Sequence, residues 1–255
     1  MKSLTKLSVA LWVLTLSLLF FVSCKKIEVD EVQDNIKQTK SFSSDVVIKW
    51  LNMQLDMFRV PLAPGTGSQA ADRALAYCGI ALYESVVEGM PSYQSLSGQL
   101  NAFPQMPSAE PGKEYHWAAC ANAALAEMNR KLFPTTSAEN KTNIDNLENT
   151  LQSAYAGEVD AATIQRSIAF GKEVATRVFA WAATDGSANV NPPYVLPVGP
   201  GLWESTPPNF PGAVFPYHSQ RRQLVPGSYD GAAPAPPPVY STAPGSEFFA
   251  MVKNV

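Results

Sequence analysis

The sequence predicts an all-α protein, a bundle of about five helices followed by an ordered, proline-rich strap. Three observations predict this fold class. Apolar residues recur at helical spacing from residue 44 to residue 186, and Pro and Gly separate the periodic segments. The composition then changes sharply, because residues 187–245 hold 14 of the chain's 21 prolines. A net charge of -3 gives no strong field, so nucleic acid is not expected as a partner.

The first 24 residues are interpreted as a bacterial lipoprotein signal peptide. Lys2 and Lys6 precede an apolar run over residues 7–22, and a small residue comes directly before Cys24. This arrangement resembles a lipobox, in which Cys24 would be the site of lipid attachment; an ordinary signal peptide with an incidental cysteine is the alternative. Residues 25–43 are polar and are expected to form a tether. The domain is therefore predicted to be lipid-anchored in the cell envelope, on the periplasmic or outer surface.

The first two predicted helices cover residues 44–60 and 68–89. The second is apolar nearly all round, which favours a place at the centre of the bundle, and Gly89 and Pro91 end it. In the first helix the expected buried stripe consists of Val47, Leu51, Leu55 and Phe58, widened by Trp50, Met53 and Met57.

Three further helices complete the predicted bundle domain, residues 44–186. The third is expected over residues 111–133, and its small residues would let neighbouring helices approach closely. Thr136 and Glu139 have the spacing of a capping box at the start of the fourth helix, and Asp160 can cap the fifth.

Residues 187–246 interleave proline with aromatic residues such as Tyr194, Trp203 and Phe215. Prolines exclude a lasting helix or sheet, and a disordered linker is one interpretation. So much apolar surface favours burial, however, so we expect an ordered strap that lies over the bundle. Residues 247–255 would begin one more helix, which would be cut short at Val255.

Few individual residues suggest chemistry. Cys78 and Cys120 lie in alanine-rich segments and are expected to be buried thiols, with a disulfide as the alternative. His116 has no partner at metal-ligand spacing, which favours a packing role. The "GTGS" run over residues 65–68 lacks a Walker lysine, so it is interpreted as a flexible lead-in to the second helix.

Arginines are the remaining candidates. Arg221 and Arg222 follow His218 in an aromatic loop and could bind an anion, although a solvated loop is the favoured interpretation for His218. Arg73 is interpreted as structural, either pairing with an acid such as Asp56 or capping a neighbouring helix. No metal-binding or cofactor-binding residue is predicted within the chain.

Several stretches resemble bacterial vanadium-dependent haloperoxidase-like proteins of the type 2 phosphatidic acid phosphatase superfamily. "GLWESTPPNF" followed by "FPYHSQRRQLVPGS" resembles that family's G-x-W-x-x-T-P-P and P-Y-W-G-x-x-R-P-F segments, although His218 and Ser219 stand where Trp-Gly is usual. "DRALAYCGIALYESVVEGMPSYQSL", with Tyr83 and Glu84, resembles an early helix of the family. "AACANAALAEMNRKLFP" and "SEFFAMVKNV" resemble two further helices.

The resemblance implies an oxyanion site that this sequence lacks. The superfamily holds phosphate or vanadate with K-x(6)-R-P, P-S-G-H and S-R-x(5)-H-x(3)-D motifs, in which Lys and Arg neutralise the oxyanion and His acts as nucleophile, ligand or proton donor. None of the three occurs here. The expectation is therefore an N-terminal fragment whose catalytic groups lie beyond Val255.

Two functions follow as expectations. In the first, the chain is the scaffold part of an exported superfamily enzyme that either hydrolyses phosphomonoesters or, with vanadate as cofactor, oxidises halide with hydrogen peroxide; the chain alone would be inactive. Its partners would be the membrane, through Cys24, and the missing catalytic half. The second is a non-catalytic surface lipoprotein, such as a glycan-binding module that uses exposed tryptophans like Trp203.

Overall fold

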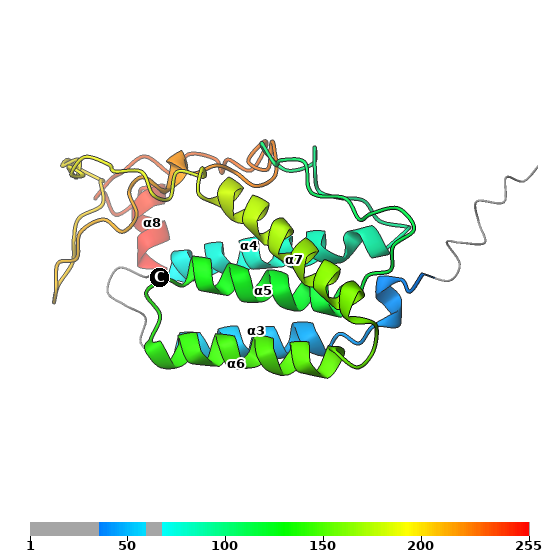
Figure 1. Cartoon of the computed structure of the whole chain (residues 1–255). Helices are drawn as coiled ribbons and strands as arrows, with labels where there is room; N and C mark the ends of the chain where they lie inside the picture. The colour runs from blue at the N-terminus through cyan, green and yellow to red at the C-terminus, as the bar shows by residue number, and fades with distance from the viewer. Residues whose placement is uncertain (1–35, 60–67, 255) are drawn as a thin grey trace, which may run out of the picture.

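Five helices pack together and a long irregular segment projects from one end of them (Figure 1). The computed structural model describes residues 36–59 and 68–254. No β-strand occurs in these ranges, so the predicted all-α class is confirmed. The helices are α3 (Asp45–Arg59), α4 (Ser68–Val86), α5 (Trp117–Leu132), α6 (Ala138–Tyr155), α7 (Ala161–Ala182) and α8 (Glu247–Lys253). Three 3-10 turns, η1 (Thr39–Ser41), η2 (Val87–Gly89) and η3 (His218–Gln220), accompany them.

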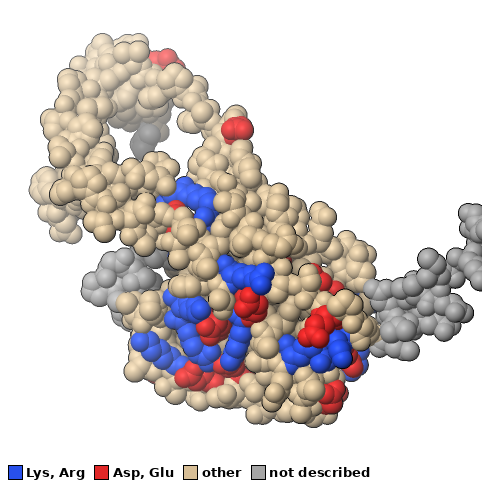
Figure 2. Space-filling view, turned by 45° about the horizontal axis from the view of Figure 1, so that its top comes forward, with Lys and Arg blue, Asp and Glu red and all other residues tan. Residues whose placement is uncertain are grey.

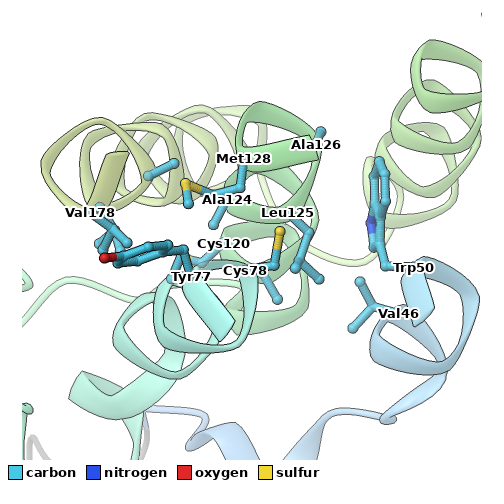
Figure 3. Packing of buried hydrophobic residues seen from close by; sticks show 14 of the residues in the cluster. Val46, Trp50, Tyr77, Cys78, Cys120, Ala124, Leu125, Ala126, Met128 and Val178 are labelled. Carbon is cyan, nitrogen blue, oxygen red and sulfur yellow. The ribbon is translucent and has the colours of Figure 1, made fainter. Parts of the chain in front are cut away.

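Helix α5 is the centre of the bundle. It contacts α3 and α6, which pack together on one side, and α4 and α7, which pack together on the other (Figures 1 and 3). Its first ten residues, 117–126, are all buried, and six of them are alanines, small enough for four neighbours to approach. The prediction that the second helix, α4, would be central is wrong, because α4 leaves residues such as Gly79 exposed.

Helices α5 and α7 approach closely at Gly171. A Cβ atom at this position would overlap the backbone carbonyl oxygen of Cys120. Glycine is therefore required here by packing rather than by backbone conformation. Val174, Ala175 and Val178 continue the same buried face of α7.

Helix α3 buries only part of the predicted face: Trp50, Met53 and Met57 are buried as expected, but the stripe expected at its centre is not. Val46, Trp50, Met53 and Met57 are buried, whereas Leu51 and Leu55, predicted to be central to the buried stripe, are each 51% exposed. Both sets have helical spacing, so periodicity alone does not choose between them. The set that contains Trp50 is the buried one, and the Trp50 indole N–H donates to Asn122 Oδ1 on α5 at 2.9 Å.

Helix starts are set by side-chain caps. Asp160 accepts hydrogen bonds from the backbone N–H groups of residues 162 and 163, as predicted for α7. Helix α6 is capped by Ser137, which accepts from the backbone N–H of residue 140, so the predicted Thr136 and Glu139 capping box is wrong by one residue. Helix α5 begins at Trp117 rather than near residue 111, because His116 is its N-cap.

The loop between η2 and α5 lacks regular structure yet belongs to the core. Phe103 and Met106 are buried in the main hydrophobic cluster. Buried Glu84 accepts hydrogen bonds from Ser95 Oγ at 2.8 Å and from the backbone N–H of Leu96 at 2.6 Å. The neighbouring Tyr83 hydroxyl donates to the carbonyl of Gln94 at 2.8 Å. The two residues at the end of α4 thus hold this loop in place.

The strap, residues 187–246, projects past the end of the bundle instead of covering it (Figure 1). Most of its large apolar side chains are exposed: Val190, Tyr194, Val195, Val198, Leu202, Trp203, Phe210, Val214, Val225, Tyr229, Val239 and Tyr240. Its contact with the bundle is concentrated at Arg222 and Leu224, the latter accepting a hydrogen bond from the backbone N–H of Asn101 at 2.8 Å. The expectation of a strap buried over the bundle is therefore wrong.

The start of the described chain contacts the bundle. Within the last part of the predicted polar tether, residues 25–43, Lys37 accepts a hydrogen bond through its carbonyl from the Trp117 indole N–H at 3.0 Å, and Thr39 Oγ1 donates to the carbonyl of Val86 at 2.7 Å. The proposed signal peptide and Cys24 lie outside the described residues. Among the helices that are described, none is long and apolar enough to cross a membrane.

Candidate functional site

A cluster of polar side chains joins α4, α7 and the strap at Asp185. Arg73 Nε lies 2.6 Å from Asp185 Oδ2, and Arg73 Nη2 donates to the carbonyl of Ala182 at 2.7 Å. The Tyr77 hydroxyl donates to the same carboxylate oxygen at 3.0 Å. Arg73 therefore pairs with Asp185 rather than with Asp56, and it also satisfies a carbonyl at the end of α7, in keeping with the structural role expected of it.

Arg222 attaches the strap to this cluster. Its backbone N–H donates to the carbonyl of Asp185 at 2.9 Å, and its guanidinium donates to Thr184 Oγ1 at 2.8 Å and to the carbonyl of Trp181 at 2.6 Å. The guanidinium carbon lies 4.4 Å from the centre of the Trp181 ring. The positive charge of Arg222 lies against the C-terminal end of α7 and the face of the Trp181 ring. Arg222 therefore attaches the strap to the bundle.

The electrostatics of the cluster follow from these contacts. Burial by itself would raise the pKa of Asp185, but hydrogen bonds from Arg73 and Ser187 outweigh it, so the pKa lies below its ordinary value. Burial, with the nearby Asp185 carboxylate, raises the pKa of Tyr77. The cluster is thus an ionised carboxylate with its donors already in place.

His218 and the two arginines after it do not form one site. His218 is exposed in η3, and the guanidinium of Arg221 lies 5.8 Å from the Phe215 ring, while Arg222 is bonded to α7. The structure therefore supports a solvated position for His218 and gives the three side chains separate surroundings.

His116 is a buried structural residue. Its Nδ1 accepts a hydrogen bond from the backbone N–H of Ala119, so Nε2 carries the proton and donates to Glu158 Oε2 at 3.1 Å. The rings of Phe42 and Tyr155 lie 4.7 and 4.6 Å from the imidazole centre. This agrees with the packing role expected from the sequence.

Cys78 and Cys120 are both free and buried, as expected. Burial raises the pKa of the Cys78 thiol to about 12 and also raises that of Cys120, so neither is a reactive thiolate. Within the described ranges, no group of His, Cys, Asp and Glu side chains is arranged to hold a metal ion. The "GTGS" run falls outside these ranges up to Gly67, and Ser68 begins α4.

A second feature, which periodicity did not predict, is an apolar cleft of about 310 Å³ on the bundle. It lies between the start of α3 and the end of α4, with α5 as its floor. The sequence carries one signal of it in Gly79, a glycine in the middle of a helix where no turn requires one.

Comparison with known proteins settles the fold. A bacterial vanadium-dependent iodoperoxidase of known crystal structure superimposes on this chain with a TM-score of 0.64 and 25% sequence identity. The chain has a haloperoxidase-like fold. The match covers 82% of this chain but only 48% of the iodoperoxidase, so the chain spans about half the length of that protein. No protein-family model and no curated protein matches it.

The described residues do not fit a vanadate or phosphate group. Such a site needs several unpaired Arg or Lys side chains around one oxyanion, together with histidine. Here Arg73 is paired with Asp185, Arg177 with Glu173, and Arg130 with Asp145 and Glu148. On the face that Figure 2 shows, blue and red side chains are interspersed over the helical body.

Proposed function

We propose that this chain is the scaffold portion of an exported haloperoxidase and acid phosphatase superfamily protein, whose oxyanion-binding groups lie in a further portion. One observation carries this proposal: four fifths of the chain superimpose on less than half of a vanadium-dependent iodoperoxidase. The absence of the P-S-G-H motif from the sequence supports it. The reaction of the whole protein would be halide oxidation with hydrogen peroxide or phosphomonoester hydrolysis, both of which use an oxyanion site.

The strap is the first candidate for contact with that further portion. Only Glu204, Arg221, Arg222 and Asp230 carry charge within it, and the two arginines lie at its attachment to the bundle. Figure 2 accordingly shows a projecting lobe with hardly any charge. Exposed aromatic side chains together with few charges are typical of the core of a protein interface. This composition supports a structural role in which the strap packs against other protein.

The test is the nucleotide sequence of the gene beyond the codon for Val255. We expect the frame to continue for a domain's length and to encode P-S-G-H with flanking arginine motifs. A stop codon directly after Val255 in the native gene would remove the proposal. In parallel, the purified 255-residue chain should turn over neither halide with vanadate and peroxide nor a phosphomonoester, and measurable turnover would contradict the scaffold role.

Attachment to the membrane through Cys24 is part of the same proposal. Its support is the sequence pattern of residues 1–24. Expression with a radiolabelled fatty acid should label the wild-type chain and leave Cys24→Ser unlabelled and soluble. Equal labelling of both proteins, or of neither, would remove the anchor.

A second candidate function is glycan binding, and exposed Trp203 favours it. This side chain is 52% exposed on the strap, and Tyr229 is also exposed. Aromatic faces in water are suited to stacking against sugar rings. Titration with β-glucan oligosaccharides should quench tryptophan fluorescence in the wild type and not in Trp203→Ala. Absence of saturable quenching in the wild type would exclude binding of β-glucans at Trp203.

A further inference from the structure

The cleft on the bundle is lined mainly by apolar side chains, with a few hydroxyls at its edge. Leu82 and Val86 of α4 form one wall, Val47 of α3 forms the other, and Ala118 and Ala121 of α5 lie on the floor. Two of the hydroxyls at its edge are used inside the protein, since Thr39 donates to the carbonyl of Val86 and Tyr83 donates to that of Gln94. Those of Ser43 and Ser44 lie at the start of α3. An occupant would therefore be held by apolar contact and shape.

Exposed side chains extend this apolar surface along α3. Ile48, Leu51 and Leu55 are each about half exposed, at 52%, 51% and 51%. Val47, Leu51 and Leu55 are four residues apart, so they form one ridge that leaves the cleft and runs along the helix. At 1.5 Å per residue the ridge reaches roughly 12 Å beyond Val47. A small molecule in the cleft would leave this ridge uncovered, whereas a helix lying along it would cover both.

Gly79 provides room for a backbone at the same place. It is an exposed residue in the middle of α4, and a Cβ atom there would meet no atom within 4 Å. Glycine in a helix interior is about 0.5–1 kcal/mol less favourable than alanine, and no contact within the described residues compensates for this. Close approach by another backbone is a reason for a glycine at such a position.

The arrangement of the helices leaves a position for one more helix. α3 packs with α6 and α4 packs with α7, and α3 and α4 meet α5 separately instead of packing along one another. Figure 3 shows Val46 and Trp50 of α3 on one side of α5, and Tyr77 and Cys78 of α4 on the other. The cleft lies between these two helices.

We propose that the cleft and the α3 ridge receive an amphipathic α-helix from the remaining portion of the haloperoxidase-like fold. This inference rests on the proposed function, since more than half of the iodoperoxidase chain has no counterpart here. The helix presents apolar side chains at spacings of three and four residues to Leu51, Leu55 and Leu82, with its backbone against Gly79. A second copy of this chain is the competing occupant.

Substitutions at Gly79 test whether the cleft is occupied, because the sign of their effect depends on the occupant. In the 255-residue chain, Gly79→Leu and the control Gly79→Ala should each raise Tm, by about 1–4 °C, since they improve helix propensity without a clash. In the longer gene product, Gly79→Leu should lower Tm by several degrees, because its side chain would fill the space of the partner helix. A rise of similar size in both proteins would overturn the proposal.

Photo-crosslinking identifies the occupant. Benzoylphenylalanine at position 51 of the full gene product, where the native Leu51 is half exposed, should cross-link to a residue beyond position 255 of the same molecule. The same probe at exposed Thr176 on α7 is the matched control and should not reach that residue. Cross-links from position 51 to residues 36–254 of a second copy, or no cross-link at all, would overturn the proposal.

Failure of this inference can be told apart from failure of the proposed function. If the reading frame stops at Val255, the scaffold role is wrong, and so is the proposal that a helix occupies the cleft. The other case is a frame that continues and encodes the oxyanion motifs, while position 51 cross-links elsewhere and Gly79→Leu raises Tm in both proteins. In that case the scaffold role stands, and only the proposal that a helix occupies the cleft is wrong.

Discussion

Two long irregular segments within the described residues, the loop over residues 90–116 and the strap over residues 187–246, differ in what surrounds them. Both lack helix apart from η3, and both contain aromatic residues and proline. Phe103 and Met106 of the loop are buried, and Glu84 fixes its backbone, whereas Trp203 and Phe210 of the strap are exposed. An apolar composition therefore shows that a segment needs a partner, but it does not show that the partner lies in the same bundle.

This contrast also separates two kinds of stability. The loop shares the core of the five helices, so it should unfold only when the bundle does. The strap is attached to the bundle chiefly at Arg222 and Leu224. The parts of the strap before and after these residues should therefore open without unfolding of the bundle. The predictions below compare the strap with the bundle or test the joint between them.

The largest expected difference is in the rate of proteolysis. Elastase should cut after exposed valines of the strap, such as Val195 and Val239, at least about 100-fold faster than any bond within residues 90–182, because cleavage in the core requires global opening. Mass spectrometry of a time course identifies the cuts. Early cleavage of the loop between Ala102 and Phe103 would contradict the contrast between the two segments.

Two tryptophans should differ strongly in their contribution to stability. Trp50 is fully buried and bonded to Asn122, so Trp50→Ala should lower the free energy of unfolding by about 3–5 kcal/mol. Trp203→Ala, on the strap, should change it by no more than about 0.5 kcal/mol. Urea unfolding followed by circular dichroism measures both. Similar losses for the two variants would mean that the strap is part of the core.

Two glycines provide the matching test for packing. Gly171→Val should destabilise the chain by about 1–3 kcal/mol or more, because its side chain would collide with the Cys120 carbonyl. Gly212 in the strap has no atom within 4 Å of a Cβ position, so Gly212→Val should be within about 0.5 kcal/mol of the wild type. Thermal unfolding of both variants measures the difference, and equal Tm values for the two would contradict a role of the α5–α7 contact in stability.

The last effect should come from the joint between strap and bundle, and it should depend on pH. The pKa of Asp185 is lower in the folded state than in the unfolded state, so its stabilisation is complete above its unfolded pKa and is lost as pH falls through the folded pKa. Asp185→Asn should cost about 1.5–3 kcal/mol at pH 7. Its unfolding free energy should also fall less than that of the wild type below about pH 4. If the unfolding free energies of the two proteins changed in parallel with pH, Asp185 would be excluded as the source of the pH dependence.

Local signals predicted most of the bundle. The helical spacing of apolar residues predicted all five helices. Asp160 identified the start of α7, because a cap acts within a few residues. The start of α5 was missed because a capping histidine is rare, and the rotation of α3 was missed because two apolar faces overlap on one helix. The Asp185 cluster was not predicted, since its members Arg73, Tyr77 and Arg222 come from distant segments.

The sequence by itself determined the all-α class, the likeness to haloperoxidases and the absence of an oxyanion motif, because these depend on spacing and residue type along the chain. Only the tertiary structure decided which helix is central, which face of α3 is buried and where the strap lies. These depend on how side chains of particular volumes meet across the bundle. The cleft beside Gly79 was likewise decided by the tertiary structure. It lies between helices, so no spacing of residues along the chain predicts it.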